Sequence, residues 1–202
     1  MASASWLAPA LIFAACASTA APVVTTRPSA SVVLNNQGGA LEGHTPRGFA
    51  GMGTGLFVGD NLNPSFPDGD GVQIYLTFEA TSPMSSVSSA TLSSRFLNVR
   101  GTPFDDLGTL WAEAVTYDTF GPGLFDLSAA GAPVACVRTD AGIDCDVTDV
   151  VRVAAEVDET RIQFRLRFDL AGDGDGSQDL AMFFRSDSNT NEPGLFTLTI
   201  TR

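Results

Sequence analysis

The sequence predicts an all-β protein: a single jelly-roll-like β-sandwich of about eight or nine antiparallel strands with one short helix. Three observations support this prediction. Apolar and polar side chains alternate with a period of two in several segments, as in strands with one buried and one solvated face. The 20 Gly and 11 Pro residues provide many turns. Long helical patterns do not separate the strand patterns, so βαβ units and a parallel sheet are not expected.

The alternation is clearest in residues 72–79, 161–170 and 196–201, where every second residue is a large apolar one. Each of these segments is predicted to be a strand that buries one face. Further strands are expected near residues 31–34, 56–59, 88–99, 109–117, 133–138 and 180–185. The helix is expected after Asp146, with Asp149 three residues on in the pattern of a capping box. It would cross one end of the sandwich.

The first residues predict export. Residues 1–20 contain no charged side chain, and the apolar run at 6–15 is shorter than the roughly 20 residues that a membrane span needs. Small residues follow, as in a secretory signal peptide. The residues Phe-Ala-Ala-Cys that end at Cys16 resemble a lipobox, which predicts a lipid on Cys16. The alternative is ordinary cleavage after Ala20.

This reading divides the chain into three parts. Residues 1–20 are a signal peptide, residues 21–49 a linker with an initial strand, and residues 50–202 the β-sandwich domain. The protein is expected in the cell envelope as a lipoprotein or outside the cell as a secreted protein. It would contact the membrane only through a lipid anchor.

The three cysteines fit this prediction. When Cys16 is lipidated or cleaved away, Cys136 and Cys145 remain, and they flank a turn-like stretch at 140–142. We expect a disulfide between them across a hairpin, because exported proteins enter oxidising compartments in which disulfides form. The alternative is a pair of reduced cysteines.

Charge excludes one class of partner. The 23 acidic residues outnumber the 11 basic ones, all of which are Arg, and the net charge is −12. Such a balance disfavours nucleic-acid binding, which needs basic side chains opposite the phosphates. It suits solubility outside the cell or binding of divalent cations. The single histidine, His44, lies in a Gly-rich stretch without a nucleophile motif, so no catalytic residue is predicted and the protein is not expected to be an enzyme.

Two sets of side chains are candidates for ligand binding. Arg161, Arg165 and Arg167 would share the solvated face of the 161–170 strand, with Arg185 on a neighbouring strand. Guanidinium groups bind carboxylates in bidentate fashion, so this ridge suits an acidic polysaccharide. The alternative is a solvated face paired with nearby Asp and Glu.

The second set is aromatic. Trp111 and Tyr117 would lie on one side of the 109–117 strand. An exposed ring is a platform for the C–H face of a sugar. The alternative is that both rings are buried in the core.

An acidic loop is the candidate metal site. Asp173, Asp175 and Asp179 stand at positions one, three and seven of a Gly-rich stretch, which resembles the start of a Ca²⁺-binding loop. The pattern lacks an acid at the fifth position and a Glu at the twelfth. The alternative is a plain turn between two strands. Residues 68–71 are a weaker copy of the motif.

Several segments, in order along the chain, suggest a family. They are residues 55–60, 72–78, 87–92, 146–151, 162–166, 184–187 and 192–195. The match rests on an sA.L strand, a DVT..V helix and an S....P.L ending. In these parts the chain resembles the DNRLRE-type, carbohydrate-binding-module-like jelly-roll domains of bacterial and archaeal surface proteins. The resemblance covers residues 50–202 except 118–135, and it implies a sugar-binding or surface-packing role.

Together these observations predict a non-catalytic exported surface or envelope protein with a carbohydrate-binding-like β-sandwich that binds polysaccharide. The alternative is a structural or adhesive surface protein that binds other proteins. A small secreted glycan-active enzyme is the third reading. A concave groove lined by exposed aromatic rings and Arg would favour the sugar, whereas a flat apolar patch would favour a protein partner.

Overall fold

The computed structural model describes residues 31–35, 41–44, 56–62, 71–84, 86–184 and 195–202. The proposed signal peptide, Cys16 and Arg185 lie outside these residues, and so does the acidic stretch at 68–71. No helix in the described ranges is long and apolar enough to cross a membrane.

Strands dominate the described part of the chain, and every strand pair is antiparallel. The strands are β1 (Ser31–Asn35), β2 (Leu41–His44), β3 (Leu56–Asp60), β4 (Gly71–Glu79), β5 (Ser89–Ser94), β6 (Leu97–Arg100), β7 (Leu110–Ala114), β8 (Val134–Arg138), β9 (Ile143–Asp146), β10 (Arg161–Phe168), β11 (Asp179–Phe183) and β12 (Thr197–Thr201). The helices are α1 (Pro103–Asp106), the 3₁₀ turn η1 (Pro122–Leu124) and α2 (Thr148–Glu156).

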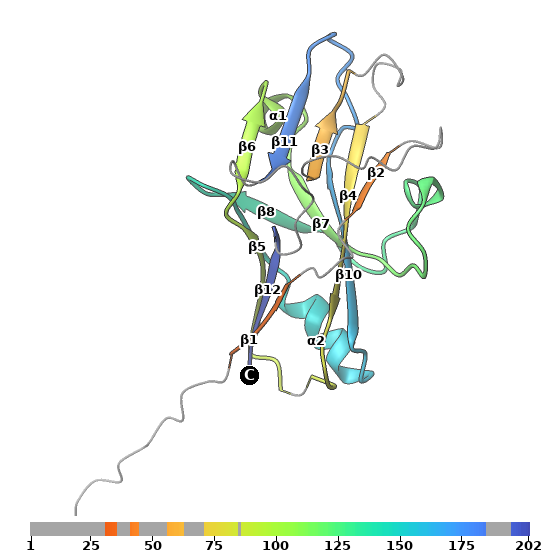
Figure 1. Ribbon diagram of the computed structural model, residues 1–202, viewed down its shortest axis with the longest axis vertical. Helices are drawn as coiled ribbons and strands as arrows, with labels where there is room; N and C mark the ends of the chain where they lie inside the picture. Colours follow the sequence, from red (N-terminus) through yellow and green to blue (C-terminus); the bar gives the residue numbers. More distant parts are fainter. Residues whose placement is uncertain (1–30, 36–40, 45–55, 63–70, 85, 185–194) are drawn as a thin grey trace, which may run out of the picture.

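The twelve strands form one curled sheet with the order β1-β12-β5-β9-β8-β7-β10-β4-β3-β11-β6, and β2 pairs with β4 off this path (Figure 1). Strand β8 joins the two halves, because it pairs with β7 on one side and β9 on the other. The all-β, antiparallel prediction is therefore confirmed.

The predicted strand number is wrong: the described residues form twelve strands instead of eight or nine. The additional strands are short. Strands β2, β6 and β9 have four residues each, too few for a period of two to stand out in the sequence. The predicted 88–99 strand is in fact two strands, β5 and β6, which pair with different neighbours.

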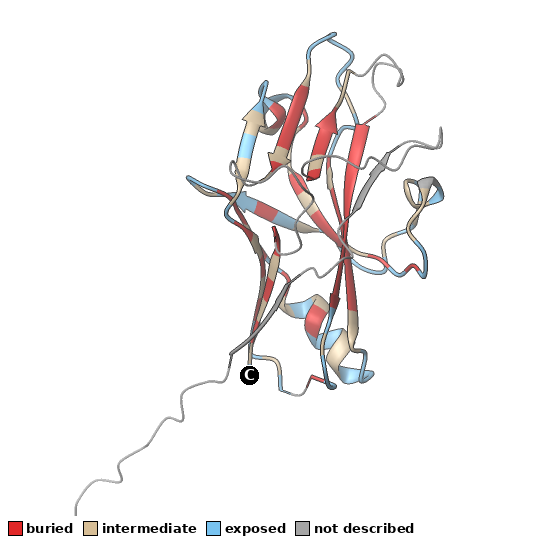
Figure 2. Ribbon diagram, in the orientation of Figure 1, coloured by how far each residue is buried: buried red, intermediate tan, exposed pale blue. Residues whose placement is uncertain are grey.

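The main core fills the inside of the curl. It combines alternate residues of both halves of the sheet, for example Leu76 and Phe164 from one half and Leu92 and Leu198 from the other. Figure 2 shows the buried residues running along β3, β4, β10 and β11. Burial of these side chains is the main favourable term for the fold.

The predicted helix is confirmed as α2. The carboxylate of Asp146 accepts a hydrogen bond from the backbone N–H of Thr148, the first residue of the helix. Val151 is buried against the core, while Val153 and Val157 are exposed. The helix therefore covers one end of the curled sheet and leaves part of its apolar surface uncovered (Figure 1).

One prediction about the sheet is wrong. The polar face of the 161–170 strand is not solvated, since Gln163 and Arg165 on this face are buried. A second, smaller apolar cluster lies there, formed by Tyr75, Val115 and Tyr117. Phe120, Leu124 and Leu127, all from the connection between β7 and β8, pack against it. This connection covers the outer face, which the alternation alone does not predict.

The predicted disulfide is confirmed. Cys136 of β8 and Cys145 of β9 are direct cross-strand partners, and their sulfur atoms are bonded. Both side chains lie in the main core. The bond therefore fixes the register of the β8–β9 hairpin, next to the strand that joins the two halves of the sheet.

We expect the double variant Cys136→Ala/Cys145→Ala to lower the free energy of unfolding by about 2–3 kcal/mol, because a loop of this length loses its cross-link in the unfolded state. Urea denaturation of oxidised wild type and variant measures the difference. Mass spectrometry of the non-reduced, alkylated protein is the direct check, and alkylation of both thiols in the native protein would contradict the bond.

Candidate functional site

The predicted Arg ridge is built around an acidic residue. Glu113 of β7 is the direct cross-strand partner of Arg165 on β10. Its Oε2 accepts hydrogen bonds from Nε of Arg165 at 2.8 Å and from Nη2 of the same side chain. Its Oε1 accepts from Nε and Nη2 of Arg167 at 3.0 and 2.7 Å. Each oxygen of this carboxylate therefore accepts two hydrogen bonds from one guanidinium group.

This cluster is closed to solvent on most sides. The side chains of Glu113 and Arg165 are 4% and 8% exposed, and that of Arg167 is 33% exposed. Nη1 of Arg165 donates to the backbone oxygens of Phe125 and Leu127, which lie in the connection that covers the face. Arg165 is thus fully engaged within the protein, and Arg167 is largely so.

The charges of the two Arg side chains decide the ionisation of Glu113. Burial alone would raise the pKa of Glu113, but the hydrogen bonds and charges of Arg167 and Arg165 outweigh it and lower the pKa. Glu113 is therefore ionised at neutral pH. The cluster has two positive charges for one negative charge, so removal of the carboxylate would leave a buried guanidinium without a counter-ion.

The predicted aromatic pair is also engaged. Tyr117 is buried, and its hydroxyl is 3.1 Å from Oγ1 of Thr77. Its ring packs edge-on against Tyr75, whose pKa burial raises to about 12. Trp111 is partly exposed, but its Nε1–H donates to Oδ1 of Asp169 at 2.6 Å. For Tyr117, the structure therefore agrees with the alternative that the ring is buried and not with an exposed sugar-binding platform.

Arg161 has a different environment from the other two arginines. It is partly exposed and lines a groove, and its Nε is buried without a hydrogen-bond partner in the described part of the chain. The structure therefore brings Arg165 and Arg167 together on Glu113, whereas Arg161 lines the groove.

The groove that Arg161 lines has a volume of about 530 Å³. It lies between α2, the end of β7, the start of β10 and residues 130–134. Most of the lining is small and apolar, and it includes Val150, Val153, Val157 and Ile162. No aromatic residue is among the lining residues. Asp149 and Glu159 supply negative charge at its edge.

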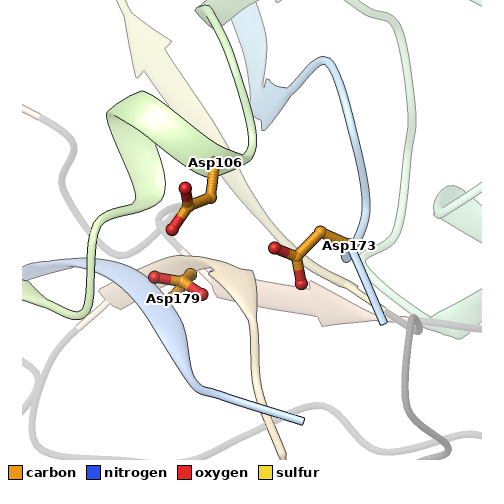
Figure 3. A group of neighbouring side chains, drawn as sticks. All are labelled: Asp106, Asp173 and Asp179. Atoms are coloured by element: carbon orange, nitrogen blue, oxygen red, sulfur yellow. The ribbon is translucent and has the colours of Figure 1, made fainter. Parts of the chain in front are cut away.

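A second candidate site is acidic. Carboxylate oxygens of Asp106, Asp173 and Asp179 lie within 4.8 Å of one another (Figure 3). Asp106 ends α1, Asp173 lies in the loop after β10, and Asp179 begins β11. Asp175, the other predicted ligand, is exposed and accepts a hydrogen bond from the N–H of Ser177 at 2.6 Å. The structure therefore places Asp106, instead of Asp175, beside the other two.

Asp106 and Glu113 are not among the residues predicted from the sequence. Asp106 is the last residue of the short helix α1, far in sequence from the loop after β10, and no sequence pattern connects the helix with the loop. Glu113 carries a weak signal, because an acidic residue within a mostly apolar strand requires a partner when it is buried.

No protein-family model matches this chain, and no curated protein is similar to it.

We expect Glu113→Gln to lower the free energy of unfolding by about 3–5 kcal/mol at pH 7, because it leaves Arg165 buried without a counter-charge. Since the pKa of Glu113 is lowered in the folded state, its contribution is present at neutral pH and is lost as the pH falls through that folded pKa. Denaturant melts at several pH values measure this. The difference between wild type and variant should shrink in acid, whereas Glu79→Gln at an exposed strand end should have little effect at any pH.

Proposed function

We propose that this protein is an exported, non-catalytic surface protein that binds a segment of another protein in the groove beside α2. The observation that carries the proposal is apolar surface left uncovered. Val153 and Val157 are 63% and 72% exposed, lie one helical turn apart and line the groove. A row of exposed apolar side chains beside an apolar groove is typical of an interaction site.

The groove suits a peptide better than a sugar. Sugar sites commonly present an aromatic ring to the C–H face of the ligand, and the lining has none. Three of the residues predicted for sugar binding are held by internal contacts: Glu113 binds Arg165 and Arg167, and Asp169 binds Trp111. The polysaccharide prediction stays a prediction, but these residues give it little support.

The charge of the rim indicates the chemistry of the segment. Asp149 and Glu159 lie on the groove, and the exposed residues Glu156 and Asp158 are close to them in sequence. The chain as a whole has a net charge of −12. A segment with two or more large apolar side chains flanked by Lys or Arg would complement this surface.

Export is supported by chemistry as well as by the N-terminal sequence. A disulfide such as Cys136–Cys145 is stable in oxidising compartments and rare in the cytoplasm. We also propose that the curled sheet is a distorted jelly roll, in which β8 connects two antiparallel layers around one core. This assignment would agree with the resemblance to carbohydrate-binding-module-like surface domains, without requiring that the sugar site be retained.

The test is a selection of peptides from a random displayed library on the oxidised protein, followed by affinity measurement. We expect enriched peptides to contain apolar anchors flanked by basic residues. The variant Val153→Gln/Val157→Gln should weaken their binding at least about tenfold, because two buried apolar contacts are lost.

Val137→Gln is the matched control, since Val137 is 66% exposed and does not line the groove. It should leave the affinity unchanged. A glycan array and polygalacturonate are applied to the same three proteins. Binding of a glycan together with equal peptide affinity in all three would contradict the proposal and favour the polysaccharide.

A further inference from the structure

The three carboxylates at the end opposite α2 come from separate parts of the chain (Figures 1 and 3). Asp106 is in α1, Asp173 in the loop after β10 and Asp179 at the start of β11. Oxygens of all three lie within 4.8 Å of one another. Like charges at such a distance repel, and each raises the energy of the others.

Asp179 is the residue that sets this cluster apart from an ordinary acidic surface. It is 1% exposed, and the two other members are exposed. Its Oδ1 accepts a hydrogen bond from the backbone N–H of Thr102 at 2.5 Å. Its Oδ2 is buried and has no hydrogen-bond partner within the described residues. A buried carboxylate oxygen without a donor is costly, so its persistence requires another source of positive charge.

No ion pair among the described residues supplies that charge to Asp179. The charged members of the cluster are acids, and the ion pairs of the described residues involve Glu113, Asp144 and Asp149 instead. Thr102 contributes a backbone N–H to Asp179 and its hydroxyl to Asp106, which are neutral donors. A bound cation would meet both needs, because it neutralises the repulsion and occupies the free side of Oδ2.

We propose that Asp106, Asp173 and Asp179 bind a calcium ion. All three offer oxygen atoms, and neither Cys nor His belongs to the cluster, which disfavours zinc. The ligands come from three separate segments, one of them a loop in which Gly174 and Gly176 have positive φ. Ca²⁺ accepts irregular oxygen shells, whereas Mg²⁺ requires near-ideal octahedral geometry and releases its waters reluctantly.

The ion would fasten the loop after β10 to α1 and β11. Gly101, in the segment between β6 and α1, lies very close to the start of β11: its φ is +67°, and a Cβ there would lie 2.2 Å from Oδ1 of Asp179. Because of this close approach, the N–H of Thr102 donates to Oδ1 of Asp179, and Oδ2 of Asp179 stays available to the ion. The inference is independent of the proposed peptide groove, which lies beside α2.

Isothermal titration of the metal-free full chain with CaCl₂ tests the site. We expect one ion per chain with a Kd on the order of 10⁻⁴–10⁻³ M, as in extracellular calcium modules. Asp106→Asn and Asp173→Asn should each raise the Kd at least about tenfold. The melting temperature of the wild type should rise by about 5–10 °C at a hundredfold excess of Ca²⁺ over Kd, relative to EDTA.

Asp175→Asn is the matched control, because it removes the same charge from the same loop without removing a member of the cluster. It should keep the wild-type Kd. Both cluster variants replace exposed residues, and their melting in EDTA should equal or exceed that of the wild type, since one repulsive charge is gone. The proposal is overturned if MgCl₂ reproduces the effect of CaCl₂, if chelator leaves the melting temperature unchanged, or if Asp175→Asn weakens binding as much as Asp106→Asn.

Discussion

The fold depends on one buried carboxylate. Glu113 lies between Arg165 and Arg167 and binds both, so β7 and β10 are joined on their outer face by charge as well as by backbone hydrogen bonds. Arg165 in turn holds the connection between β7 and β8 through the carbonyls of Phe125 and Leu127. Because buried charges are tolerated only when they are paired and hydrogen-bonded, this arrangement constrains the strands and the covering segment at once.

The covered outer face of β7 and β10 limits where the protein can bind a ligand. Once the outer face is covered, Arg165, Tyr75 and Tyr117 hold the structure together and are not presented to solvent. The two candidate sites among the described residues lie at opposite ends of the molecule: the apolar groove beside α2 and the carboxylates around Asp179 (Figure 1). One suits an apolar, basic peptide segment and the other a hard cation. They share no residue, so each can be tested without disturbing the other.

Sequence reasoning succeeds here where a signal is local. The period of two correctly places β4, β10 and β12, and the turn between Cys136 and Cys145 correctly predicts their bond. It fails where tertiary contacts decide. Arg165 alternates with apolar residues as a solvated residue would, and the connection after β7, which has no periodic pattern, buries it. Asp106 joins Asp173 and Asp179 through the topology of the sheet, which no spacing in the sequence encodes.

Chemical modification of individual arginines measures whether the outer face is closed to solvent. The native protein is treated with phenylglyoxal, and modified sites are quantified by peptide mass spectrometry. We expect Arg95 and Arg152, whose side chains are 55% and 48% exposed, to react readily, while Arg165 is protected until the protein is unfolded. Modification of Arg165 in the native protein at the rate of Arg152 would contradict it.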